Sequence, residues 1–154
     1  MKKKLKKFYS FIIKKIFDLI YDELILASED FFNKNVLIKS VYFSNNKSKY
    51  YNIYLVNNCR VYSDNSQNVA VIKKNFLLPK ISIQLGENKL VEATHNSILN
   101  TGTRKLIQKK IKGDLLSLIQ GVSAINNYGH WMLDILPKLC IAEKYKNLND
   151  FDAI

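Results

Sequence analysis

The residues best suited to chemistry lie in one short stretch, "NNYGHWMLDILPKL", residues 126–139 of this 154-residue chain. It holds one of the two histidines, His130, and the only tryptophan, Trp131, with Asp134 four positions after the histidine. On a helix, that spacing puts His130 and Asp134 on one face, where a carboxylate can fix the imidazole tautomer and raise its pKa. Such a histidine suits a general base or a cation that faces a phosphate. A buried, purely structural pair fits the same spacing, and both alternatives stay open.

The elements around this stretch predict how it is positioned. The apolar run "DLLSLIQG" (114–121) predicts a buried strand, and Asn126 or Asn127 can cap a helix that begins near Tyr128. The final "FDAI" (151–154) predicts another strand, so the whole order indicates a βαβ unit of a parallel sheet. The N-terminus of the helix would then offer N–H groups to an anion beyond the end of the first strand. Because the pattern stops in the middle of such a unit, we expect the chain to be the N-terminal part of a longer protein.

The predicted helix covers about residues 128–143 and contains a proline. Pro137 lacks a backbone N–H and its ring clashes with the preceding turn, so we expect a kink where the carbonyl of Leu133 loses its partner. Apolar residues occupy most of the remaining surface, which predicts a mostly buried helix. These residues are Met132, Leu133 and Leu136.

The middle of the chain predicts short antiparallel strands. From about residue 36 the spacing of the apolar residues changes from that of a helix to that of extended strands, and the segments are rich in Val, Ile, Tyr and Phe. Turn-forming clusters such as "SNNKSK" and "SDNSQN" separate them, at spacings too short for helical crossovers. Residues 87–112 are mixed, and "TRKLIQKKI" fits either a strand or a short helix.

The N-terminal residues predict an amphipathic helix over residues 5–26, with apolar residues at three- and four-residue steps. Residues 1–17 hold seven lysines and no acid, whereas the rest has 17 basic against 13 acidic residues, a net of +4 out of +11. Two alternatives stay open for this helix: it packs on its own domain, or it lies on an anionic membrane surface. The rest of the chain is only mildly basic, and charge is the only feature that favours a nucleic-acid binder.

Other features exclude several classes of protein. Hydrophobic residues make up 47% of the chain, enough for a core, and no apolar run is long enough to span a membrane. The start "MKKKLKK" imitates a signal peptide, but Lys14 and Lys15 interrupt the apolar run that follows, so we expect a cytoplasmic protein. The two cysteines, Cys59 and Cys140, stand in apolar surroundings and predict buried free thiols. No metal-ligand pattern, Walker loop or GxGxxG occurs.

The stretch around His130 resembles glycosyltransferase family 61, whose bacterial members are commonly labelled capsular polysaccharide biosynthesis proteins. The family pattern runs roughly Asn-Tyr-x-His-Trp or His-Phe, apolar residues, Asp or Glu, then Pro-Arg/Lys-Leu. The matching positions here are Asn127, Tyr128, His130, Trp131, Asp134, Pro137, Lys138 and Leu139. Gly129 departs from the pattern, because the family more often has an aromatic residue there, and this weakens any expectation of stacking on an acceptor. The specific match covers about 15 residues, with weaker support back to about residue 36 and none for residues 1–32.

The resemblance implies a two-lobed, GT-B-like enzyme that transfers a sugar from a nucleotide-sugar donor to a glycan acceptor, with inversion, in surface polysaccharide synthesis. His130 would be the base or an anion contact and Asp134 the residue that orients it. The implied substrate-binding residues are Asn127, Tyr128, Trp131 and Lys138, although Trp131 also fits a scaffold role. The resemblance leaves the metal requirement open, and no cofactor besides the donor substrate is expected. The donor nucleotide would sit mainly on a C-terminal lobe beyond this chain.

The expected fold class is therefore α/β with an α+β lead-in. Residues 1–32 would form the basic N-terminal helix, 33–112 a β-rich segment, and 113–154 the start of a Rossmann-like lobe. The alternative function is a non-catalytic module that docks on a membrane surface or a protein through the N-terminal helix. Peripheral attachment at the inner face of the membrane is compatible with either function.

Overall fold

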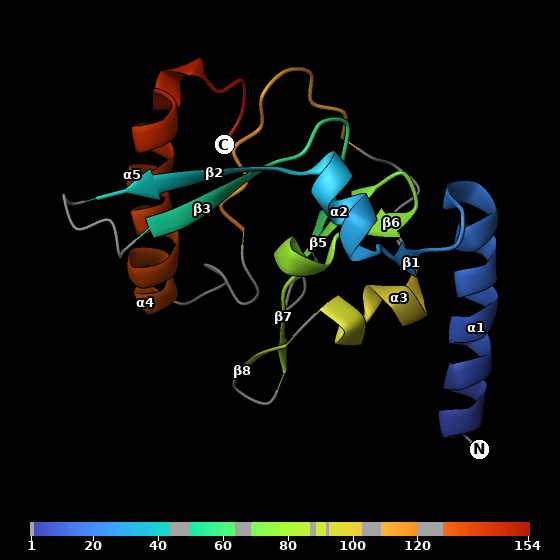
Figure 1. Cartoon of the computed structure of the whole chain (residues 1–154). Helices are drawn as coiled ribbons and strands as arrows, with labels where there is room; N and C mark the ends of the chain where they lie inside the picture. Colours follow the sequence, from blue (N-terminus) through green and yellow to red (C-terminus); the bar gives the residue numbers. More distant parts are fainter. Residues whose placement is uncertain are drawn as a thin grey trace.

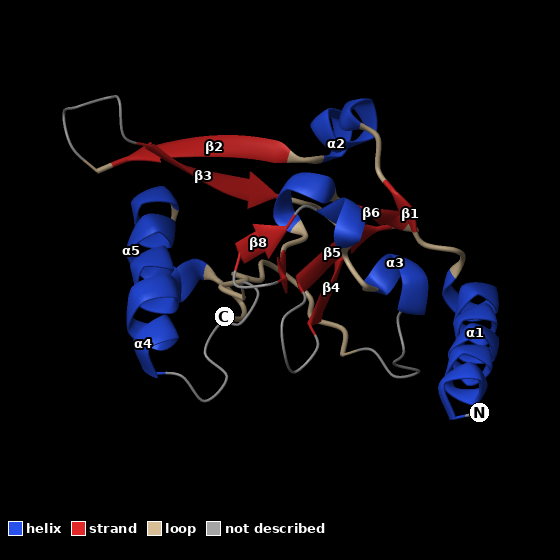
Figure 2. Ribbon diagram, turned by 90° about the horizontal axis from the view of Figure 1, so that it is seen from below, coloured by secondary structure: helices blue, strands red, loops and turns tan. Residues whose placement is uncertain are grey.

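The computed structural model describes residues 2–43, 50–63, 69–86, 89–91, 93–102, 109–119 and 128–154. It is a mixed fold of helices and small sheets, as the sequence predicts in general terms (Figure 1). The N-terminal helix α1 and the helix that carries His130 lie at opposite ends of the molecule, with the sheets between them (Figures 1 and 2).

Helix α1 spans Lys2–Tyr21, so the predicted continuation of the helix to residue 26 is wrong. The chain leaves the helix through Asp22, whose φ of 63° is left-handed, and Leu24 then enters the core. The next two residues form strand β1 (Ile25–Leu26), which pairs in parallel with β6 (Phe76–Leu77). Tertiary pairing therefore overrides the helical spacing of these apolar residues.

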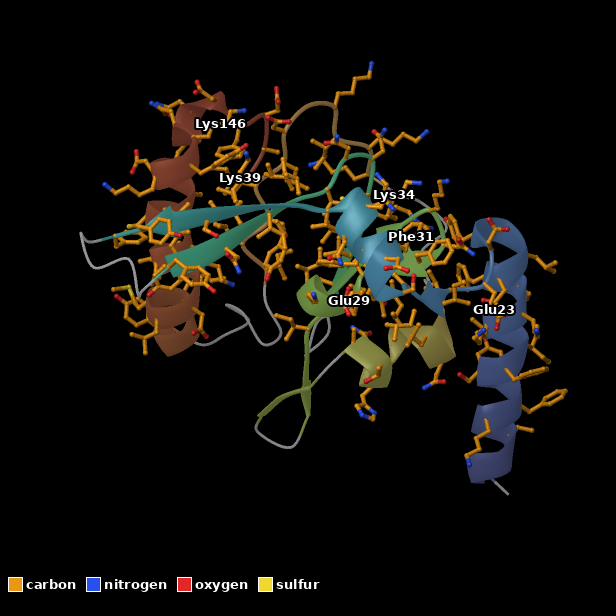
Figure 3. All side chains as sticks on the ribbon, viewed as in Figure 1. Glu23, Glu29, Phe31, Lys34, Lys39 and Lys146 are labelled. Carbon is orange, nitrogen blue, oxygen red and sulfur yellow. The ribbon has the colours of Figure 1, made fainter. Side chains whose placement is uncertain are left out.

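Helix α2 (Glu29–Asn35) follows at once and was not predicted. The Ser28 side chain caps it by accepting a hydrogen bond from the Phe31 N–H, and two acidic residues stand in the first turn. Phe32 is fully buried, while Phe31, which is labelled in Figure 3, stacks on Phe76 with ring centroids 4.2 Å apart.

The largest sheet in the described part of the chain has the order β1-β6-β5-β4. Strand β4 (Arg60–Ser63) pairs antiparallel with β5 (Val69–Lys73), and β5 pairs antiparallel with β6. A second sheet is the antiparallel pair of β2 (Leu37–Tyr42) and β3 (Tyr50–Leu55), and a third is β7 (Gln84–Gly86) with β8 (Lys89–Val91). The predicted antiparallel strands are confirmed, and the parallel pair β1–β6 is an addition.

Short helical turns cover this sheet: η1 (Pro79–Ile81), η2 (Ala93–His95) and α3 (Ile98–Thr101). The core beneath them is made of small and aliphatic residues: Leu24, Ala70, Ile72, Leu77, Ala93 and Ile98. Asn96 is also buried, and both ends of its amide are used. Its Nδ2 donates to the Val69 carbonyl at 3.1 Å, and its Oδ1 accepts from the Ile98 N–H at 3.1 Å. This side chain joins the sheet to α3, as a satisfied buried amide can.

The C-terminal region contains one helix in three parts, α4 (Tyr128–His130), η3 (Trp131–Ile135) and α5 (Leu136–Tyr145), followed by the turn η4 (Leu148–Asp150). The predicted buried strand over 114–121 is wrong within its described residues, 114–119. Asp114 and Leu115 are exposed, and the only regular pairing of this run in the described part is one bridge at Leu115. The apolar run is extended but not covered, because no described strand flanks it on its second side.

The cysteines also differ from the prediction. Cys59 is only partly buried and Cys140 is exposed, although both are free thiols. Cys140 lies on the outer side of α5, where the surrounding apolar sequence had indicated a core position.

Candidate functional site

The helix that carries the motif is continuous from Tyr128 to Tyr145 but irregular in its middle. It begins as α4 (Tyr128–His130), passes through a π-helical turn η3 (Trp131–Ile135) and continues as α5 (Leu136–Tyr145). Pro137 explains the irregularity, because its ring would clash with the carbonyl four residues earlier in a regular α-helix. The wider turn, with its i→i+5 hydrogen bonds, relieves that conflict. The described residues are helical from Tyr128 on, as predicted, and the irregular turn lies just before the proline, where a kink was predicted.

The π-helical turn changes which residues share a face. It inserts one extra residue into the helix. His130 and Lys138 are eight positions apart in the sequence, but along the helix their backbones are placed like residues seven apart in a regular α-helix, which share a face. Asp134 lies between them, within the wide turn itself. The motif thus places a histidine, a carboxylate and a lysine along one side of the helix backbone.

The predicted burial of this helix is wrong. Tyr128 and Leu133 are 79% and 78% exposed, and Trp131 and Met132 are also exposed. Among the described residues of the helix, only Ile135 and Ala142 are buried. The helix packs beneath strand β2 along a narrow face, so the aromatic residues of the motif form a surface rather than a core.

Lys138 ties this helix to the segment that precedes the motif. Its Nζ donates a hydrogen bond to the Leu118 carbonyl, 2.9 Å away, in a partly buried position. Burial lowers the pKa of Lys138 from its ordinary value, and the nearby Asp134 carboxylate opposes that shift. Asp134 and Lys138 therefore interact electrostatically one turn apart, at the base of the exposed aromatic surface.

The ends of this unit are held together by a second group of polar contacts. Leu115 and Ala153 form a parallel bridge, in which the Leu116 N–H donates to the Ala153 carbonyl at 2.9 Å. The Asp114 N–H donates to Asp152 Oδ2 at 2.7 Å, and the Lys146 ammonium pairs with Asp114 Oδ2 at 2.7 Å. Lys146 stands just past the last turn of α5 (Figure 3), and its hydrogen bond with Asp114 raises its pKa. The parallel direction of the bridge agrees with the predicted βαβ order.

The structure brings together some of the predicted site residues. Asp134 and Lys138 are partly buried neighbours, whereas Tyr128 and Trp131 are exposed on the first turns of the helix. His130 lies on α4, but its side chain is outside the described part of the structure, and Asn127 lies wholly outside the described residues. Sequence reasoning missed Leu118, Asp114 and Lys146. Of the three, only Lys146 had a recognisable signal, because it is a lysine just beyond the end of the predicted helix.

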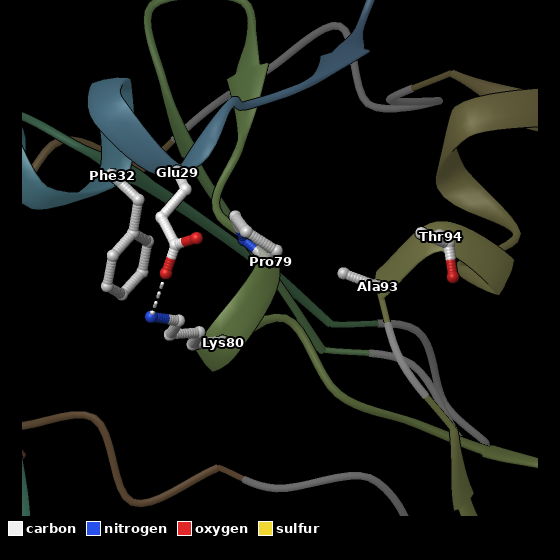
Figure 4. A pocket seen from close by; sticks show the side chains of 6 residues that line it. All are labelled: Glu29, Phe32, Pro79, Lys80, Ala93 and Thr94. Carbon is white, nitrogen blue, oxygen red and sulfur yellow. Dashed lines mark hydrogen bonds and ion pairs between the residues drawn. The ribbon is translucent and has the colours of Figure 1, made fainter.

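A pocket lies elsewhere in the molecule, between α2, η1 and η2 (Figure 4). Its volume is about 310 Å³, and its lining residues are Glu29, Phe32, Pro79, Lys80, Ala93 and Thr94. Lys80 Nζ pairs with Glu29 Oε1 at 3.0 Å and lies 5.3 Å from the centre of the Phe32 ring. The two charges neutralise each other, and both side chains are exposed, so this pocket offers a ligand little unsatisfied charge. The motif helix, in contrast, carries the partly buried polar side chains of Asp134 and Lys138.

Within the described residues, no group of three His, Cys, Asp or Glu side chains is placed to hold a metal ion. None of the helices in the described part is both long enough and apolar enough to cross a bilayer.

Comparison with known proteins adds no relative: no family model, no curated protein and no solved structure matches this chain.

Proposed function

We propose that this chain is the N-terminal part of a glycosyltransferase, which moves a sugar from a nucleotide-sugar donor to a glycan acceptor in surface polysaccharide synthesis. The proposal rests on the resemblance of the residues around His130 to glycosyltransferase family 61. The GT-B-like, Rossmann-like lobe that begins near residue 113 is part of the same proposal. The parallel bridge between Leu115 and Ala153, with a helix between the two segments, supports it.

The observation that carries the proposal furthest is the π-helical turn at Trp131–Ile135, in the centre of the motif. Such turns are rare, and they occur frequently at functional sites because they re-aim side chains at a cost in helix regularity. Here the turn holds Asp134 beside Lys138 and moves the backbone of His130 into the same register. Pro137, which accompanies the turn, is itself one of the residues that resemble the family.

The exposure of the motif also favours binding. The first turns of the helix present Tyr128 and Trp131 to solvent, at the end where backbone N–H groups and the helix dipole attract an anion. Aromatic faces suit the apolar side of a sugar ring, and the positive end of the helix suits a phosphate. A glycan and the diphosphate of a donor are therefore compatible with neighbouring parts of this surface.

In the proposed reaction, His130 takes the proton from an acceptor hydroxyl while that oxygen bonds to the anomeric carbon of the donor. The bond from this carbon to the diphosphate breaks on the opposite side, and the nucleoside diphosphate leaves with the electron pair. Asp134 orients the imidazole and stabilises its charged form. The helix N-terminus stabilises the leaving diphosphate, as preorganised dipoles do in other transfer reactions.

The test is a screen of nucleotide sugars with the complete protein that contains this chain, following release of nucleoside diphosphate. We expect hydrolysis or transfer with at least one donor, and a fall in turnover of roughly 100-fold or more for His130→Ala. Asp134→Asn should cost less, because it removes orientation and charge but leaves the base. Glu143→Gln, an exposed position on the same helix, is the matched control and should keep full turnover.

The structural alternative gives the opposite pattern. If His130 and Asp134 only satisfy each other, both substitutions lower the melting temperature, since each leaves a polar group unpaired at a cost of about 1–3 kcal/mol. Turnover per folded molecule would then stay near the wild-type value. That result, or a complete lack of reaction with every donor, would reject the proposed function.

A further inference from the structure

The apolar side of helix α1 faces away from the rest of the molecule. Side chains project from α1 on the side opposite the sheets (Figure 3). The exposed apolar residues are Leu5, Phe8, Tyr9, Phe11, Ile12, Ile16, Leu19 and Ile20, among which Leu19 is 87% exposed. An ordinary surface helix turns such residues toward its own core, so the orientation of α1 is reversed.

The inward side of α1 is held by polar and aromatic contacts instead. Lys14 Nζ pairs with Asp18 Oδ2 at 2.7 Å, and these side chains are only 17% and 11% exposed. Helix α1 contacts α3, where Gly102 lies against Phe17, and Arg60 stacks over the ring of Tyr21 at 5.4 Å. The reversed orientation therefore follows from specific contacts between α1 and the body.

These contacts also pair most of the acidic residues near α1 with a lysine. Asp18 faces inward and is paired, and Glu23 lies 3.4 Å from the same Lys14 ammonium. Asp22 is exposed but stands beyond the last residue of the helix. Exposed apolar side chains of α1 thus stand beside the exposed lysines Lys7 and Lys15, in a segment whose first 17 residues contain seven lysines and no acid.

We propose that α1 lies flat on an anionic lipid bilayer, with its exposed apolar face in the boundary between headgroups and acyl chains. This arrangement suits a helix with lysines beside a large apolar face, and each lysine gains from the negative surface potential. A second copy of this chain fits less well, because pairing two such helices would bring their lysines together. The inference is independent of the proposed glycosyl transfer.

The test measures binding of the whole chain to sedimented vesicles of phosphatidylcholine, with and without about one third phosphatidylglycerol. We expect binding to the anionic vesicles that weakens with salt, and little binding to phosphatidylcholine alone. The double variant Phe8→Gln/Leu19→Gln should bind at least about tenfold more weakly, because it removes apolar area from the lipid boundary. The variant Lys7→Gln/Lys15→Gln should lose roughly 30-fold.

The matched control is Lys110→Gln/Lys112→Gln, which removes two exposed lysines from the body and should bind like the wild type. Circular dichroism and thermal melting of each variant check that the fold is kept. Three results would overturn the proposal: no binding to anionic vesicles, an equal loss in the control, or full binding by the apolar variant. A dimer in solution that the apolar variant dissociates would also overturn it, since a second copy would then cover this face.

Discussion

The ammonium group of Lys138 and the carbonyl oxygen of Leu118 are joined by a 2.9 Å hydrogen bond, although 20 residues separate them in the chain. This contact fixes the motif helix to the extended segment that precedes it. Together with the Leu115–Ala153 bridge and the pairing of Lys146 with Asp114, it joins the described residues 114–119 to the C-terminal helix.

Replacing Lys138 with methionine should loosen this arrangement. Methionine keeps most of the aliphatic length but leaves the partly buried Leu118 carbonyl without its donor. We expect a loss of about 1 kcal/mol in the free energy of unfolding, measured by urea denaturation. Lys144→Met, at an exposed position of the same helix, is the control and should have almost no effect. Equal stability of the Lys138→Met protein and the wild type would show that the contact contributes nothing.

The same lysine predicts a dependence on pH. Burial lowers the pKa of Lys138 below its ordinary value of 10.5, so the unfolded state binds this proton more tightly than the folded state. The contribution of Lys138 to stability should therefore rise with pH between its folded pKa and 10.5, and level off above that. The measurement is the difference in unfolding free energy between the wild type and Lys138→Met at several pH values in this range. A difference that shrinks as pH rises would contradict the lowered pKa.

Much of the fold follows from local patterns in the sequence. The strands between residues 36 and 86 have β-branched and aromatic residues and clear turn clusters, so their antiparallel pairing is predictable. The periodicity of the motif predicts its helix, and the proline marks the irregular turn. Helix α2 was missed although "SEDFF" carries a serine cap and an acidic first turn, which are sufficient signals.

The errors concern burial and long-range pairing. Spacing shows that α1 and the motif helix have apolar faces, but not which side each helix turns toward the body. In α1, the Lys14–Asp18 pair and the stacking of Arg60 on Tyr21 decide this, and both depend on partners that no local pattern reveals. In the same way, the parallel pairing of β1 with β6 joins residues about 50 positions apart and interrupts a helical spacing. For the candidate site, the sequence identifies the residue types but not the exposure of Tyr128 and Trp131.

Gly113 should be essential for closing the C-terminal unit. Its φ is +94°, and a Cβ added there would overlap the Asp152 carboxylate, which accepts the hydrogen bond from the Asp114 N–H. Gly113→Ala should therefore destabilise the protein by about 1–3 kcal/mol, because the backbone is strained and Asp152 must move. Gly129→Ala is the matched control: this glycine is exposed and helical, so alanine should stabilise the helix by up to about 1 kcal/mol. Thermal melting of the two variants would contradict this account if both changes had the same sign.

The two cysteines provide a test of exposure that does not depend on function. Cys140 is exposed on α5, whereas Cys59 is partly buried and its burial raises the pKa of the thiol. The thiolate is the form that reacts, so Cys140 should react with a thiol reagent such as dithionitrobenzoate markedly faster than Cys59 at neutral pH. The single-cysteine variants Cys59→Ala and Cys140→Ala separate the two rates, and both thiols should react fast in denaturant.

Raising the pH should speed the reaction of Cys59 over a range that extends above its ordinary pKa of 9.0, because its thiol must lose a proton from a partly buried position. Faster labelling of Cys59 than of Cys140 in the native protein would contradict the partial burial of Cys59, just before β4, and the exposure of Cys140 on α5.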